Sequence, residues 1–261
     1  MECRNQVLRF VSSISFLLIL TLVLPMIVAA AAGAARQAVA LADEQYSRRC
    51  EPGMVDTFIA GLEEANRATP GECEILWRLS RAYWFKSTRV PENDKKTRLD
   101  LLNRGKAYAE EATASDPKSA NAYYWLAASI AQAGQIRGIL QSLASVKPTK
   151  AALDKGLEVD PRHASCHYLM AELYLQLPGA PLSIGDKKKA LEEASLAVKY
   201  DPGESCHHLV LGRALIATKQ YDEARAALNR LIEMEPSKED PEGFNKDQDA
   251  AREELKSIAR K

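Results

Sequence analysis

The sequence has no surplus of positive charge and few cysteines or aromatic residues, and each shortage excludes a class of protein. Its 35 Lys and Arg residues equal its 35 Asp and Glu residues, so it lacks the basic surplus that nucleic-acid binding requires. Five cysteines in 261 residues are too few for a small disulfide-held scaffold. Aromatic residues make up 7%, whereas Ala, Leu, Glu and Lys dominate. This composition predicts helices rather than sheets.

Catalytic signatures are missing as well. The chain contains no G-x-S-x-G, no Gly-rich phosphate loop, no H-E-x-x-H and no C-x-x-C, which are the patterns that mark common hydrolases, nucleotide-binding proteins and metal or redox enzymes. We therefore expect a protein that is not an enzyme and that carries no cofactor.

Residues 1–35 have the pattern of a targeting segment. Arg4 and Arg9 precede residues 11–32, which carry no charge and end on the small residues Ala30–Ala32, as at a signal-peptide cleavage site. The uncharged run is also long enough for a bilayer, which needs about 20 residues. The sequence therefore predicts either a cleaved signal peptide or an uncleaved N-terminal membrane anchor. In a bacterium both place the rest of the chain in the periplasm or at the membrane.

An internal repeat dominates the rest of the chain. An Asp-Pro pair is followed ten residues after the proline by a small residue in three segments, Asp116-Pro117 to Ala127, Asp160-Pro161 to Ala171, and Asp201-Pro202 to Gly212. Another proline, Pro236, lies 34 residues after Pro202, which is the period of the tetratricopeptide repeat. The sequence therefore predicts an all-α, right-handed solenoid of helix-turn-helix units that stack on one another.

The predicted tetratricopeptide-repeat domain covers residues 36–261. Its repeats lie near 73–119, 120–163, 164–204 and 205–238, after a degenerate helix pair near 37–48 and 54–68 and before a capping helix at 246–261. Between their two helices, the first three repeats have 13, 10 and 7 more residues than the last. Such insertions collect on one face of a solenoid and often build a binding site.

Three motifs carry a resemblance to a known branch of these proteins. They are LWRLSRAY (Leu76–Tyr83), YYWLA (Tyr123–Ala127) and PGAPLSIGD (Pro178–Asp186). Together they resemble the TRAP-transporter T-component family, and they are similar to the eukaryotic regulators of microtubule dynamics. The resemblance covers about residues 70–236, and the lipid-attachment cysteine of the T-components is missing. Asp186 is also placed to cap a helix that begins at Lys187.

The resemblance implies a function in transport. It implies a periplasmic or envelope protein that assists TRAP-type transport, binds a solute-binding protein and takes up a small hydrophobic or acidic ligand. The alternative is a protein-interaction scaffold in envelope assembly. The sequence leaves open whether the chain forms homo-oligomers.

The groove-lining positions of tetratricopeptide proteins, carried over by repeat phase, hold aromatic and charged side chains. We take the candidate ligand-binding residues from them: Trp77, Arg81, Trp84, Tyr124, Tyr168, Glu172 and Arg213. Aromatic walls with two arginines suit an apolar ligand that carries an acidic group. The predicted site lies between this face and the loop Pro178–Asp186. In the alternative interpretation, Trp77 and Trp84 only pack against the N-terminal helix pair.

Histidine and cysteine gather at the starts of two adjacent first helices. The weak metal candidates are His163, Cys166, His167, Cys206 and His208. They allow a soft-metal site, a Cys166–Cys206 disulfide in an oxidising compartment, or ordinary packing.

Overall fold

The computed structural model describes residues 33–261, and residues 1–32, with nearly all of the predicted targeting segment, lie outside the described part. Residues 33–261 contain helices and no strand, apart from one isolated bridge between Gly179 and Gly185. The all-α architecture that the sequence predicts is therefore confirmed. No helix within residues 33–261 is both long and apolar enough to cross a membrane.

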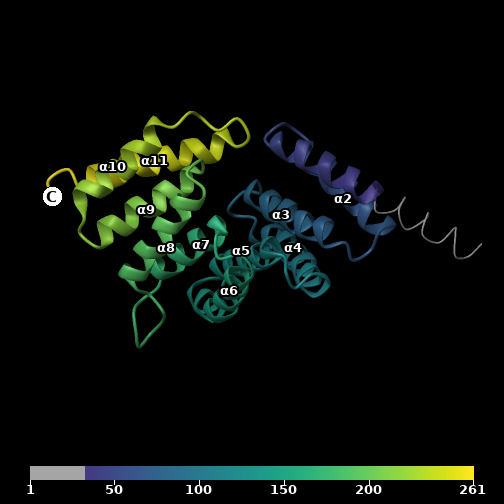
Figure 1. Ribbon diagram of the computed structural model, residues 1–261, viewed down its shortest axis with the longest axis horizontal. Coiled ribbons are helices and arrows are strands. Elements are labelled where there is room, and N and C mark those ends of the chain that lie inside the picture. The colour runs from purple at the N-terminus through teal and green to yellow at the C-terminus, as the bar shows by residue number, and fades with distance from the viewer. Residues whose placement is uncertain (1–32) are drawn as a thin grey trace, which may run out of the picture.

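The helices form consecutive pairs that stack along a curved chain (Figure 1). A helix over residues 33–47 and α2 (Met54–Ala68) form the N-terminal pair. The repeat pairs are α3 (Cys73–Thr88) with α4 (Lys95–Ser115), α5 (Ala120–Arg137) with α6 (Ile139–Val159), α7 (Ala164–Gln176) with α8 (Lys187–Tyr200), and α9 (Ser205–Ala217) with α10 (Tyr221–Glu233). The last helix, α11 (Pro241–Ser257), packs against α9 and α10.

The helix ends follow the local signals in the sequence. Asp116, Asp160 and Asp201 are the first residues after α4, α6 and α8, and none of them has helical backbone angles. Each stands before a proline, which disfavours the helical conformation of the residue that precedes it. Asp186 caps α8 as predicted, because its Oδ1 accepts hydrogen bonds from the backbone N–H of Lys188 at 3.0 Å and of Lys189 at 3.2 Å.

Small residues bring the two helices of a repeat into close contact. Ala127 and Ala171 are completely buried. At Gly212 in α9, a Cβ atom would overlap the Leu228 side chain of α10. A methyl group at this position would therefore displace the Leu228 side chain or the helix that carries it.

Two of the three insertions lengthen helices instead of forming long loops. In the second repeat, α5 and α6 are joined by Gly138 alone, whose φ of 105° is accessible to glycine. Both α4 and α6 have 21 residues, against 13 in α10, so most of the inserted chain lengthens helices. Only the third insertion, at residues 177–186, remains a long loop. The first two insertions therefore supply no long loop to a binding site.

The C-terminal helix has the predicted capping role. It begins at Pro241, five residues before the predicted start, because Asp240 caps it through a hydrogen bond from the Gly243 N–H at 3.0 Å. Its apolar side chains face the solenoid, and Ala251 and Ile258 are completely buried. This helix covers the apolar surface of the last repeat, which no further repeat covers.

Candidate functional site

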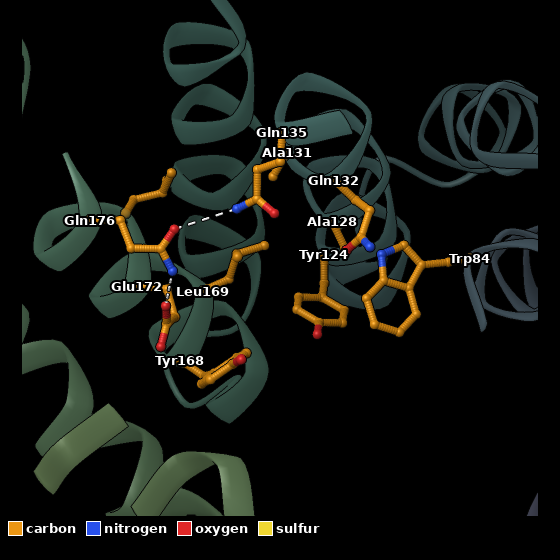
Figure 2. Close-up of a pocket in the computed structure, with 11 residues that line it drawn as sticks. Trp84, Tyr124, Ala128, Ala131, Gln132, Gln135, Tyr168, Leu169, Glu172 and Gln176 are labelled. Atoms are coloured by element: carbon orange, nitrogen blue, oxygen red, sulfur yellow. Dashed lines mark hydrogen bonds between the residues drawn. The ribbon is translucent and has the colours of Figure 1, made fainter. Parts of the chain in front are cut away.

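A cavity of about 220 Å³ lies on the concave face, between α3, α5 and α7. Its wall from α5 includes Tyr124, Ala128 and Gln132, which are four residues apart and therefore share one helix face. On α7, Tyr168, Glu172 and Gln176 have the same spacing and face the α5 residues across the cavity. The full lining is Trp84, Tyr124, Ala128, Ala131, Gln132, Gln135, Tyr168, Leu169, Glu172, Leu173 and Gln176 (Figure 2).

Aromatic rings form much of this cavity's wall. Trp84 and Tyr124 both pack against Trp125, with ring centroids 5.7 Å and 4.9 Å apart, while Tyr168 packs against His207 at 5.5 Å. Burial raises the pKa of Tyr124 and of Tyr168, so both phenols stay neutral at physiological pH. These contacts hold the rings in place before any ligand binds.

The polar side of the cavity is built from amides and one carboxylate. Gln135 donates from Nε2 to Gln176 Oε1 at 3.4 Å, and Gln176 donates to the Glu172 carboxylate (Figure 2). The Glu172 side chain is 13% exposed, and Arg213 lies 3.9 Å from it. Burial raises the pKa of Glu172, and the charge of Arg213 opposes that rise. Trp84 Nε1 is buried and finds no acceptor among the described residues.

Three of the predicted site residues, Trp77, Arg81 and Arg213, do not line this cavity. Trp77 is 6% exposed and packs in a cluster with residues of α4 and α5 rather than with the N-terminal helix pair. Arg81 donates to Asp43 Oδ1 at 2.8 Å, and its guanidinium lies 3.7 Å from the centroid of the Tyr46 ring. Asp43 and Tyr46 lie in the helix over residues 33–47, which lacks the repeat pattern. The structure therefore moves the site toward α7 and leaves it without the predicted arginine.

The predicted residues other than Trp77 and Arg81 lie in the cavity wall or behind it. Trp84, Tyr124, Tyr168 and Glu172 converge on the cavity. Arg213 lies behind Glu172 and donates from Nε to Glu254 Oε1 at 3.0 Å. The loop of residues 177–186 contributes none of the described lining residues, so the cavity does not extend to the loop beside which the sequence places the ligand. Ala131, Gln135, Leu169 and Leu173 were missed, because the repeat phase marks one residue per turn and the cavity extends to the neighbouring positions.

The candidate metal ligands do not come together. Within residues 33–261, no group of three or more His, Cys, Asp or Glu side chains is placed to hold a metal ion. Cys166 and Cys206 both carry free thiols, and Cys166 is completely buried. Packing is the interpretation that fits these side chains.

The histidines have local partners of their own. His163 Nδ1 accepts from Cys166 N at 3.2 Å, His167 Nδ1 shares a hydrogen bond with Glu193 Oε2 at 2.6 Å, and His208 Nε2 donates to Pro202 O at 3.0 Å. Burial lowers the pKa of His167, but hydrogen bonds to the Glu193 carboxylate and the Pro161 carbonyl outweigh burial and raise it overall. These contacts hold the ends of helices and the contacts between neighbouring helices in place.

Ion pairs join the two ends of the solenoid. We call this set the clasp: Arg49 and Arg89 on the N-terminal side, and Glu239, Asp240 and Glu242 on the C-terminal side. Arg89 Nη2 lies 2.9 Å from Asp240 Oδ1, and Arg49 Nη1 lies 3.1 Å from Glu239 Oε2. Arg89 also pairs with Glu242. No sequence pattern marks these partners, which are 151 to 190 residues apart.

The two ends of the solenoid also touch beside the clasp. Figure 1 shows the segment before α11 lying beside the segment before α2, and Cys50 Sγ is 3.3 Å from Glu239 O at this contact. The two ends of the solenoid are therefore in direct contact.

Comparison with known proteins identifies relatives for both halves of the chain. The family described as "Regulator of microtubule dynamics protein 1-3" matches residues 37–177, which are 141 of the 261 residues. The family described as "Tetratricopeptide repeat" matches residues 185–243. Of the two resemblances in the motifs, these matches support the one to the microtubule regulators and give no support to TRAP-type transport.

Individual relatives are identical to the chain at between a quarter and a third of the aligned positions. It is 28% identical over 191 residues to regulator of microtubule dynamics protein 1 of Caenorhabditis elegans, covering 67% of this chain and 83% of that protein. It is 27% identical over 189 residues to regulator of microtubule dynamics protein 3 of Rattus norvegicus, covering 67% of this chain. The chain spans 40% of the length of that protein and of the Pongo abelii protein 1.

A solved structure supports the fold. A thermophilic tetratricopeptide-repeat protein of Thermus thermophilus matches 86% of this chain and 99% of its own, with a TM-score of 0.61 at 18% identity. At this identity, the likeness shows that the chain is a tetratricopeptide-type solenoid and nothing about its ligand.

Proposed function

The chain belongs to the family of regulator of microtubule dynamics proteins 1–3, and we propose from this premise that it is a non-enzymatic scaffold that binds a protein partner. The proposed binding site is the cavity between α3, α5 and α7. Following the names of its relatives, we propose regulation of microtubule dynamics as the process in which it acts. Tetratricopeptide solenoids present concave surfaces of this kind to partner proteins.

The size of the cavity is the observation that carries this proposal. Pockets for drug-sized molecules measure about 300–1,000 Å³, and this cavity of about 220 Å³ falls below that range. One large side chain fits such a space, while the rest of its segment lies along the concave face. The alternative occupant, a drug-sized ligand, would have much of its surface outside the cavity.

The charge of the cavity argues against the acidic ligand of the transport interpretation. The described lining residues include Glu172 but no lysine or arginine, and a carboxylate ligand needs a cationic partner when it is desolvated. The shared motifs are therefore all that supports a TRAP solute-binding protein as the partner.

The N-terminal segment carries a separate proposal. We propose that residues 1–35 export the chain or anchor it to a membrane, as their charge and hydropathy pattern indicates. Because residues 1–32 lie outside the described part of the chain, this proposal rests on the sequence pattern.

Growth of microtubules from purified tubulin, followed by light microscopy, tests the proposed function. We expect the full-length chain to change the growth rate or the frequency of switching to shortening. The Tyr124→Ala variant should lose most of this effect, because it removes one aromatic wall of the cavity. Tyr221→Ala is the matched control, since Tyr221 lies in α10 and not in the cavity.

Two results would count against it. A chain without any effect on microtubules would contradict the proposed process. Equal activity of the Tyr124→Ala variant and the wild-type chain would contradict the proposed binding site.

A further inference from the structure

The cavity has a net negative lining. Glu172 is the one charged side chain among its described lining residues, and the other polar groups are glutamine amides, tyrosine hydroxyls and the Trp84 indole N–H. An incoming anion would meet a like charge there, whereas an incoming cation would meet an opposite charge. The lining therefore discriminates between partner side chains by the sign of their charge.

The Glu172 carboxylate has one cationic partner among the described residues, and that contact is weak. Its contact with Arg213 is long, at 3.9 Å, and Arg213 at the same time donates to Glu254 at 3.0 Å. On the neighbouring helix α11, Asp247 accepts from Ser205 Oγ at 2.6 Å and adds negative charge near Glu172. A buried carboxylate with so little compensating charge is stabilised when another cation approaches it.

The aromatic walls suit the same kind of side chain. A guanidinium or ammonium group gains from lying within about 6 Å of the centre of a tryptophan or tyrosine ring. This chain already uses the contact elsewhere, because the Arg78 guanidinium lies 4.0 Å from the centre of the Trp77 ring. In the cavity, Trp84, Tyr124 and Tyr168 offer rings that no cation of the described residues covers.

We propose that this cavity selects an arginine or lysine side chain of the partner segment. The cationic group stacks on the rings of Trp84, Tyr124 and Tyr168 and pairs with the carboxylate of Glu172. The proposal rests on the proposed function, because it names the chemistry that the concave site recognises. It also excludes an acidic segment as the occupant of the cavity.

Short peptides measured against the full-length chain test this selectivity. The probes are capped pentapeptides of glycine and serine whose central residue is arginine, lysine, citrulline, norleucine or glutamate. The reporter is the Trp84 indole N–H resonance, assigned with a Trp84→Phe variant. We expect the arginine and lysine peptides to bind at least about tenfold more tightly than the uncharged ones, and the glutamate peptide to bind most weakly.

Substitutions test the negative charge of Glu172 separately from the other features of the cavity. Glu172→Gln should abolish the preference for arginine over citrulline, while Glu111→Gln, an exposed change on α4, should leave it intact. Arg213→Gln should strengthen binding of the arginine peptide several-fold, because it removes the cation that competes for Glu172. This second variant keeps the test decisive if Glu172→Gln does not fold.

The outcomes distinguish this proposal from the proposed function. Equal binding of the arginine and citrulline peptides would overturn the selectivity for cations and leave the concave site in place. If none of the peptides shifted the Trp84 resonance, the cavity would not be a binding site and both proposals would be wrong.

Discussion

Asp240 has two structural roles that substitution can separate. It caps α11 by accepting from the Gly243 N–H, and it pairs with Arg89 at 2.9 Å and with Arg49 at 4.0 Å in the clasp. Asparagine caps a helix about as well as aspartate, whereas alanine costs about 1 kcal/mol. Partly exposed ion pairs contribute about 0.2–1 kcal/mol each. Asp240→Asn should therefore lower the free energy of unfolding by about 0.5–2 kcal/mol, and Asp240→Ala should lower it by about 1 kcal/mol more.

Equilibrium urea denaturation, followed by far-ultraviolet circular dichroism, measures these differences. At about 1 M salt the Debye length falls to about 3 Å, so the difference between the wild-type chain and Asp240→Asn should shrink. The difference between the asparagine and alanine variants should persist, because a hydrogen-bonded cap is short-ranged. If Asp240→Asn matched the wild-type chain at low salt, the ion pairs would not hold the two ends together. If the two variants were equally stable, Asp240 would not act as the cap of α11.

Three further outcomes follow from the described contacts and from the N-terminal sequence. Gly212→Ala should lower the free energy of unfolding by about 1–3 kcal/mol, because the added methyl group overlaps Leu228; an unchanged urea midpoint would contradict that contact. Pairing with Glu193 raises the pKa of His167, so His167 should stabilise the fold fully below its unfolded pKa of about 6.5. This stabilisation should be lost as the pH rises through the folded value. The urea midpoint of His167→Gln, measured across this pH range, should not show this loss. N-terminal sequencing of the mature chain should find a start between Gly33 and Ala38, whereas a start at residue 1 or 2 would establish the anchor.

The predictable features of this chain are those with a local or periodic cause. Asp186 could be identified as a helix cap because the cap and the helix it begins are adjacent in sequence. Tyr124, Tyr168 and Glu172 could be placed on the concave face because the repeat phase assigns one helix face to each. Both inferences need only the geometry of a single helix or a single repeat.

The features that could not be predicted depend on partners outside the repeat pattern. Arg81 is taken up by Asp43, which lies in a helix that no repeat motif marks. Arg89 and Asp240 meet because the whole solenoid curves round, over a separation of 151 residues. The insertion around Gly138 lengthens two helices because one glycine makes the complete turn between them. In each case the observed contact or helix length depends on three-dimensional packing, which residue spacing and composition do not determine.

A photo-cross-linking amino acid introduced at position 168 tests most directly whether the concave cavity binds a protein partner. The cross-links would be formed in the cells that express the chain, and the joined peptides would be mapped by mass spectrometry against the same substitution at Tyr221. We expect position 168 to cross-link to an extended segment with an arginine or lysine next to the attachment point, and position 221 not to do so. Cross-links that form at position 221 and not at position 168 would place the partner outside the cavity and contradict the proposed binding site.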